Sequence, residues 1–155
     1  MKNDTITLET IQARQDELVA MIAAYNAAKT AITIPAATIE LQPGERYAGL
    51  VLNDDGTPSH HLVLMAARPD KQMRWEGAMG WAAKKGGALP TRREMLLIHA
   101  HCLAHVESDW YWSNERLGCD HSDAWSCHFG TGNLDNSHKH SKLRAIAVRH
   151  ILIGG

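Results

Sequence analysis

The chain has 155 residues, of which 45% are hydrophobic and 21% charged, and its formal net charge is -1. This length favours one domain with an appendage, and the composition is that of a folded protein with a buried core, which excludes disorder throughout. A net charge near zero gives no overall attraction for nucleic acid or an anionic membrane. The sequence has neither a signal-peptide core nor a membrane-spanning apolar run, so we expect no membrane insertion.

Residues 8–28 are predicted to form a helix that self-associates. Thr7 or Thr10 can cap its start, and its alanines favour helical structure. A short helix is marginal in water, so its apolar seam needs a partner, either the chain's own domain or further copies of the helix. We expect copies, with a trimer as one arrangement. The seam positions alternate by three and four residues: Leu8, Ile11, Gln15, Leu18, Ile22 and Tyr25.

We place the domain boundary after residue 31, so that residues 1–31 form the helical segment and residues 32–155 the domain. Residues 33–41 alternate apolar with polar side chains around Pro35. Proline cannot donate a ladder hydrogen bond and is confined to sheet edges and strand starts. This segment is therefore predicted to be a linker that becomes an edge strand.

A β-hairpin is predicted next. The apolar runs 47–52 and 61–65 flank residues 53–58, Asn-Asp-Asp-Gly-Thr-Pro, in which the glycine can adopt positive backbone angles. Because side chains alternate along a strand, the neighbours His60 and His61 should point to opposite faces.

Two helices are predicted in the middle of the chain. Residues 75–82 carry apolar side chains on one helical face, and this helix stops at residues 84–87, Lys-Lys-Gly-Gly. Thr91 and Glu94 form a predicted capping box, in which the hydroxyl accepts a backbone N–H and the carboxylate reaches back. The helix that follows, from residue 92 to about 106, is apolar around most of its circumference and should be buried.

Short strands are expected after residue 108, at 110–113, 124–129 and 143–151. The segments 118–122 and 130–141 are rich in glycine, asparagine, aspartate and histidine and are predicted to be exposed loops. Exposed loops on a rigid scaffold commonly carry binding residues.

Several motifs between residues 75 and 149 occur together in a known family. They are Trp75-(x5)-Trp81-Ala82, Gly86-Gly87-Ala88-Leu89-Pro90-Thr91-Arg92-Arg93-Glu94, Tyr111-Trp112-Ser113, Ala124-Trp125, Phe129-(x2)-Gly132-Asn133 and Arg144-Ala145-(x2)-Val148-Arg149. In this combination the chain resembles the C-terminal domain family of the Lcl collagen-like adhesins, which is common in phage and prophage proteins. The resemblance spans about residues 36 to 151.

The resemblance implies an α+β, C-type-lectin-like fold in which two helices flank a twisted antiparallel sheet. It also implies partner recognition more than catalysis. We therefore expect a non-catalytic module on a phage virion that binds a host protein or a surface glycan and needs no cofactor. The alternative is a phage effector in the bacterial host cytoplasm that binds a host defence or regulatory protein. The Glu-Pro-Asn and Trp-Asn-Asp triplets of calcium-dependent sugar-binding lectins are missing from this chain.

The contact surface is expected between residues 118 and 142. Its candidate ligand-binding residues are His121, Asp123, Asn133, Asp135, Asn136, His138 and His140. No acidic residue follows Asp135, whereas four basic ones do: Lys139, Lys142, Arg144 and Arg149. This basic tail is either a local patch for nucleic acid or an anionic membrane or, as we favour, a solvated strand face whose arginines pair with acids elsewhere.

A thiol- or metal-dependent oxidoreductase is the third hypothesis. His101 and His105 lie one helical turn apart, near Glu94, but the helix lacks the adjacent glutamate of a metalloprotease motif, so we expect no metal site. Cys127 alternates with Trp125 and Phe129 along a strand and should be a core residue. A bridge between Cys119 and Cys127 is conceivable only outside a reducing compartment. We expect no enzymatic activity.

Overall fold

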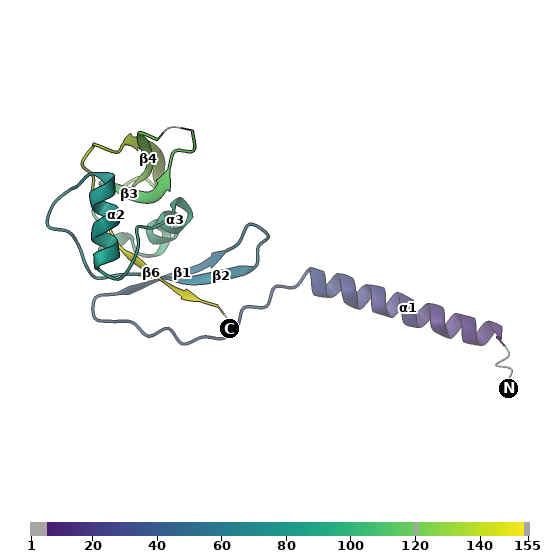
Figure 1. The fold of residues 1–155 in the computed structure, drawn as a ribbon. Coiled ribbons are helices and arrows are strands. Elements are labelled where there is room, and N and C mark those ends of the chain that lie inside the picture. The colour runs from purple at the N-terminus through teal and green to yellow at the C-terminus, as the bar shows by residue number, and fades with distance from the viewer. Residues whose placement is uncertain (1–5, 120, 154–155) are drawn as a thin grey trace. The chain divides into compact units, whose positions relative to one another are not determined.

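The computed structural model of the chain describes residues 6–119 and 121–153. The chain divides into two compact units, Met1–Ile34 and Pro35–Gly155. The first unit contains the helix α1 (Leu8–Lys29), and the second is an α+β domain, as expected (Figure 1).

Helix α1 begins with the predicted cap. The Thr7 hydroxyl accepts the Thr10 backbone N–H at 3.2 Å, and the Thr10 hydroxyl accepts the Thr7 N–H at 3.0 Å, so the two threonines form a capping box. The apolar seam residues are all between 53% and 80% exposed: Leu8, Ile11, Leu18, Ile22 and Tyr25. Among the described residues, no helix is both long and apolar enough to cross a membrane.

The first sheet of the domain is antiparallel with strand order β1-β2-β6, formed by Arg46–Leu52, Pro58–Leu64 and Val148–Leu152. The β1–β2 hairpin confirms the predicted turn, in which Gly56 has a φ of 84°. The expected edge strand at residues 33–41 is wrong, because this segment has no strand structure. Ile34 is 58% exposed, so ordering it in a strand would bury little apolar surface to offset the entropic cost.

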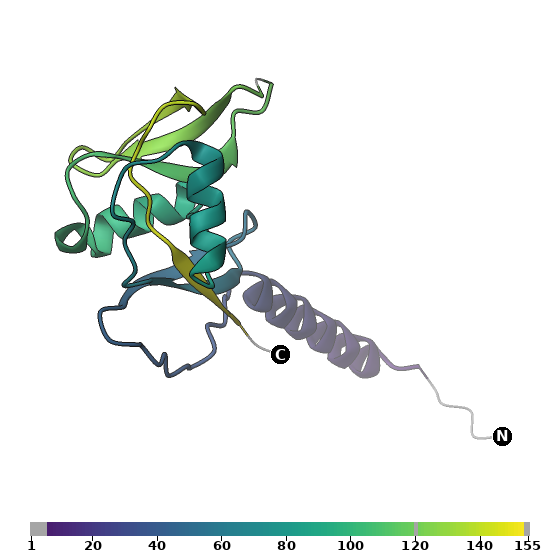
Figure 2. The same cartoon turned by 60° about the vertical axis from the view of Figure 1, so that its left-hand side comes forward.

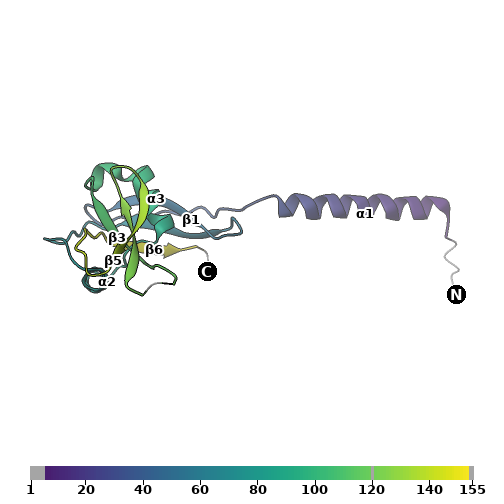
Figure 3. The same ribbon diagram turned by 90° about the horizontal axis from the view of Figure 1, so that it is seen from above.

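The second sheet has the order β3-β4-β5, formed by Trp110–Arg116, Asp123–His128 and Asn133–His138 (Figures 1 and 3). Strand β5 corrects the prediction that residues 130–141 are all loop. Its polar sequence looks like a loop, but Leu134 lies opposite Cys127 and packs on the core, which fixes the register.

The last predicted strand is shorter than expected. Residues 143–147 precede β6 and make two single bridges, from Leu143 to Met73 before α2 and from Arg144 to Tyr111 of β3. The domain has two three-stranded sheets, whereas we expected a single antiparallel sheet flanked by two helices.

Helix α3 (Arg92–His101) lies between the two sheets, whereas α2 (Trp75–Lys84) packs beside β3 (Figures 1 and 2). The predicted continuation of α3 to residue 106 is wrong. Cys102 leaves the helical conformation with a φ of −126° and is buried, and a short 3-10 turn, η1 (Leu103–His105), follows.

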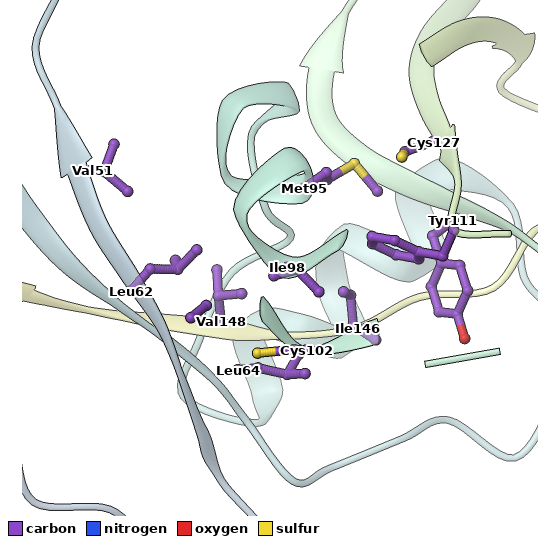
Figure 4. Close-up of a cluster of buried hydrophobic side chains, with 12 residues drawn as sticks. Val51, Leu62, Leu64, Met95, Ile98, Cys102, Tyr111, Cys127, Ile146 and Val148 are labelled. Atoms are coloured by element: carbon purple, nitrogen blue, oxygen red, sulfur yellow. The ribbon is translucent and has the colours of Figure 1, made fainter. Parts of the chain in front are cut away.

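Two clusters of buried side chains form the core. The larger cluster joins both sheets to α3 through residues such as Leu62, Met95, Ile98 and Ile146 (Figure 4). The smaller cluster surrounds Trp112, which is fully buried and donates its indole N–H to the Met73 carbonyl at 2.8 Å. Large aromatic side chains contribute much of the buried apolar area, so this segment anchors the domain.

Candidate ligand-binding site

The structure separates the seven predicted contact residues into two groups. His121, His138 and His140 line one surface hollow with a volume of about 650 Å³. The other four lie on strands β4 and β5 and do not line it: Asp123, Asn133, Asp135 and Asn136.

The hollow lies where the turn after β5 meets the segment before α2. The Trp75 backbone N–H donates to the Lys139 carbonyl at 3.1 Å, and Met73 and Leu143 exchange two backbone hydrogen bonds. The Lys139 N–H donates to the Ser122 carbonyl at 2.8 Å. These bonds hold three separate stretches of sequence around one opening, so the hollow is built on a fixed backbone frame.

Two of the histidines in the hollow stack on each other. The rings of His138 and His140 have centroids 5.2 Å apart and planes inclined by 29°, and the His140 backbone N–H donates to Nδ1 of His138 at 3.2 Å. Lys139 lies over the Trp75 ring, with Nζ 4.8 Å from the ring centroid, and also donates to the His121 carbonyl. Lys139 therefore orders the wall of the hollow as well as adding charge.

The hollow carries excess positive charge. Its lining includes a single carboxylate, from Glu76, and four basic side chains: Lys71, Arg74, Lys139 and Lys142. Within residues 6–119 and 121–153, the side chains of Lys71, Arg74 and Lys142 have no acidic partner at ion-pair distance. An opening lined mostly by charges of one sign attracts ligands of the opposite sign.

The arginines of the C-terminal segment behave differently, as predicted. Arg144 pairs with Asp109 at 2.8 Å and Arg149 with Glu45 at 2.7 Å. Hydrogen bonds from these two guanidinium groups lower the pKa of the Asp109 and Glu45 carboxyls below their ordinary values. Arg144 and Arg149 therefore form ion pairs within the domain, whereas Lys139 and Lys142 of the same segment line the basic hollow.

A neighbouring hollow of about 500 Å³ is less suited to bind an anion. It shares Lys71 with the basic hollow, but its lining also includes the carboxylates of Asp70 and Glu107. Its two arginines are engaged within the domain, because Arg68 donates to the carbonyls of Met65 and His105, and Arg144 is paired with Asp109.

Strand β5 presents the remaining predicted residues. Asn133, Asp135 and Asn136 are exposed, and among the described residues β5 pairs only with β4, so its other edge is open. Sequence reasoning missed Lys71 and Arg74, which come from the segment before α2. Their basic character was visible, but only the tertiary structure brings that segment beside the turn after β5.

The predicted histidine pair does not converge on a metal site. His101 Nδ1 bonds to the Ala48 carbonyl, whereas His105 Nε2 accepts the Arg46 Nε–H at 3.0 Å. A different group of donors lies together instead, with one donor atom each of His60, Glu94 and His150 within 4.8 Å of one another.

Only half of the predicted capping box forms, because the Glu94 carboxylate contacts the histidine group instead of the backbone. The Glu94 backbone N–H donates to the Thr91 hydroxyl at 3.2 Å, as predicted, but the carboxylate turns toward the histidines, 2.8 Å from His150 Nε2. His60 and His61 do point to opposite faces of β2, because His61 bonds to the Tyr47 hydroxyl at 2.9 Å.

All three cysteines are free. Cys102 and Cys127 are buried, and Cys119 is exposed. Burial raises the pKa of the Cys127 thiol to about 11 and also raises that of Cys102. The reactive thiolate form is thus strongly disfavoured at both buried cysteines.

No protein-family model matches this chain, and no curated protein matches it either.

Proposed function

We propose that this chain is a non-catalytic recognition module of the Lcl C-terminal, C-type-lectin-like kind, encoded by a phage and carried on its virion. Its domain binds a carboxylate-bearing protein or glycan of the host surface through the basic hollow. The observation that supports this most is a set of three cations without an acidic partner in the described part of the chain, Lys71, Arg74 and Lys142, beside three exposed histidines.

A binding role agrees with the chemistry of the hollow. Its basic side chains can satisfy carboxylate oxygens by charge-assisted hydrogen bonds, which are stronger than neutral ones. Imidazole rings such as the stacked pair His138 and His140 offer flat faces and ring N–H groups to a sugar or peptide. No cofactor is needed for recognition of this type.

The thiol-dependent oxidoreductase is the weaker candidate. A cysteine nucleophile needs a lowered pKa and an accessible sulfur. Cys127 has a raised pKa and is fully buried, and Cys102 is buried among apolar core residues. The exposed Cys119 has no second accessible cysteine among the described residues with which to form a catalytic disulfide.

Helix α1 is proposed to assemble copies of the chain, with a trimer as the arrangement to test first. Its seam residues are exposed in a single chain, and burying them between helices would remove apolar surface from water. Several weak binding domains on one assembly gain avidity without a strong individual contact.

The assembly proposal is tested by charge placement on α1. The double variant Ile11→Lys with Leu18→Lys introduces charge into the seam, whereas Ala13→Lys with Ala20→Lys places the same charges outside it. Analytical ultracentrifugation should show an oligomer for the native chain and the control, and a monomer for the seam variant. A native monomer would contradict the proposal.

The binding proposal is tested with two matched lysine pairs. Lys71→Gln with Lys142→Gln removes two charges from the hollow, and Lys84→Gln with Lys85→Gln removes two exposed charges at the end of α2. With immobilised oligogalacturonate and oligoglutamate as probes, the first variant should bind about 10-fold more weakly and the second about as well as the native chain. An equal loss of probe binding in both variants would indicate general charge attraction and would contradict binding in the hollow.

Mass spectrometry of purified virions separates the two proposed locations. Virions that contain the chain support the surface-recognition proposal. Its absence from virions, together with its capture of a host protein inside infected cells, would favour the intracellular effector.

A further inference from the structure

His60 and His150 lie together with Glu94 of α3, on strands β2 and β6 of the first sheet. Side chains of one strand alternate between faces, so His60 shares a face with Leu62 on β2, and His150 shares that face with Val148 on β6. Leu62 and Val148 are core residues, but the two histidines face the Glu94 carboxylate from α3. The pairing of β2 with β6 thus brings two imidazoles to one buried carboxylate.

The distances in this group suit a common metal ion. Glu94 Oε2 is 2.8 Å from His150 Nε2, and Glu94 Oε1 is 3.8 Å from His60 Nε2. Zinc bonds of about 2.0–2.2 Å in a tetrahedron place neighbouring ligand atoms roughly 3.3 Å apart. The two observed distances lie on either side of that value, and one ligand atom from each of the three residues lies within 4.8 Å of the others.

One ring nitrogen of His60 makes no hydrogen bond to residues 6–119 or 121–153. This atom, Nε2, is buried, and a buried polar atom normally has a hydrogen-bond partner. The other ring nitrogen, Nδ1, lies 2.9 Å from the Ser59 hydroxyl. When Nδ1 donates its proton to that oxygen, the lone pair of Nε2 is exposed to the Glu94 side of the group, as in metal sites where an outer partner fixes the ring.

We propose that His60 Nε2, the Glu94 carboxylate and His150 Nε2 bind a zinc ion. Two imidazoles with one carboxylate form a donor set typical of zinc, whereas calcium and magnesium prefer oxygen donors. Three protein ligands leave a fourth position for water or a ligand group. His60 and Glu94 also line a hollow of about 540 Å³.

This zinc site shares no residue with the basic hollow. The zinc proposal does not depend on the proposed recognition function. Zinc at this position joins β2, α3 and β6, and it therefore stabilises the folded domain.

Calorimetric titration of the tag-free, chelator-treated chain with zinc chloride tests the proposal. We expect one zinc ion per chain at this site, a higher Tm with zinc, and the absorption of tetrahedral cobalt when cobalt chloride replaces zinc. His150→Gln and Glu94→Gln should bind zinc more than 100-fold more weakly, because losing a direct ligand costs more than the roughly 10- to 100-fold lost with an outer partner. Ser59→Ala, which removes only such a partner, should weaken binding about 10-fold.

Two controls address the other histidines of the chain. His61→Asn alters the neighbouring strand residue on the opposite face, and His138→Asn with His140→Asn removes the exposed stacked pair. Both should retain the site and its cobalt spectrum. The amides introduced by His150→Gln and Glu94→Gln can still hydrogen bond within the group, and circular dichroism of each variant verifies folding. Equal zinc affinity in the native chain and folded His150→Gln would overturn the proposal, as would the absence of a zinc-dependent rise in Tm.

Discussion

The two histidine groups of the domain lie beside opposite charges. Around Glu94, which is 1% exposed, His60 is half-buried and His150 is exposed, and both face the buried carboxylate. In the basic hollow, His121, His138 and His140 are exposed and lie among lysines. A buried charge must be paired because desolvation is costly, whereas an exposed surface can keep charges of one sign. The same residue type therefore faces a buried acid in one region and exposed lysines in the other.

Strand β6 and the turn after β5 show this contrast within one short stretch. On β6, Arg149 and His150 point to opposite faces, and each meets a buried acid, Glu45 and Glu94 respectively. In the turn, Lys142 has no acidic partner among the described residues. Charge density alone cannot distinguish these roles, but burial does.

The largest expected effect comes from breaking the buried group. Glu94→Ala leaves His60 and His150 without their carboxylate and should lower the free energy of unfolding by about 3 kcal/mol, because a buried partner is lost. His140→Ala, in the exposed hollow, should change it by less than about 0.5 kcal/mol. Urea unfolding in the presence of a chelator measures both, and similar values for the two variants would remove the proposed contrast.

Thiol labelling compares buried and exposed cysteines. The pKa of Cys127 is raised to about 11 from a reference of 9.0, which lowers its thiolate fraction at neutral pH by about 100-fold. In the native chain, a maleimide should therefore modify Cys119 first, with Cys102 and Cys127 at least about 100-fold slower. Mass spectrometry after timed quenching identifies the labelled residue; rapid modification of Cys127 would show that β4 is not packed as described.

The pair of Arg149 with Glu45 gives a smaller, pH-dependent effect. Arg149→Met should lower the free energy of unfolding by about 2 kcal/mol at neutral pH, since Glu45 is buried and accepts two hydrogen bonds from Arg149. The folded-state pKa of Glu45 is lowered, so its contribution is complete above the ordinary value of 4.5 and disappears as the pH falls through the folded value. The difference between variant and native chain should accordingly shrink from pH 7 to pH 3 in urea titrations. A constant difference would assign the loss to packing of the arginine side chain instead.

The smallest effect is expected on strand β5. Asn136→Ala removes an exposed side chain that lies outside the basic hollow and should weaken probe binding by no more than about threefold, as peripheral contacts usually do. Surface plasmon resonance beside the variant Lys71→Gln with Lys142→Gln gives the comparison. A larger loss for Asn136→Ala would move the main contact surface to the open edge of β5.

Local signals in the sequence predicted the local structure well. The three-four spacing and Thr7 marked helix α1, the Asn-Asp-Asp-Gly-Thr-Pro segment marked the β1–β2 turn, and Thr91 marked the start of α3. Strand β5 escaped prediction because its Asn, Asp and Ser residues have turn-like composition, and only Leu134 contacts the core. Its strand structure comes from pairing with β4, which composition does not reveal.

The sites depended even more on contacts between distant segments. The histidines of the hollow were predicted, but Lys71 and Arg74 join them only through the backbone bonds that tie Met73 and Trp75 to the segment after β5. The group of His60, Glu94 and His150 was missed because its members come from three elements.

Binding of a carboxylate-bearing ligand in the basic hollow can be tested residue by residue. The isotope-labelled chain is titrated with soluble oligogalacturonate, and amide chemical shifts are followed in NMR spectra. We expect the largest shifts in residues 71–77 and 138–142 and at His121, with little change around His60 and Glu94. Saturable shifts centred elsewhere on the domain, or none with either oligogalacturonate or oligoglutamate, would contradict binding in this hollow.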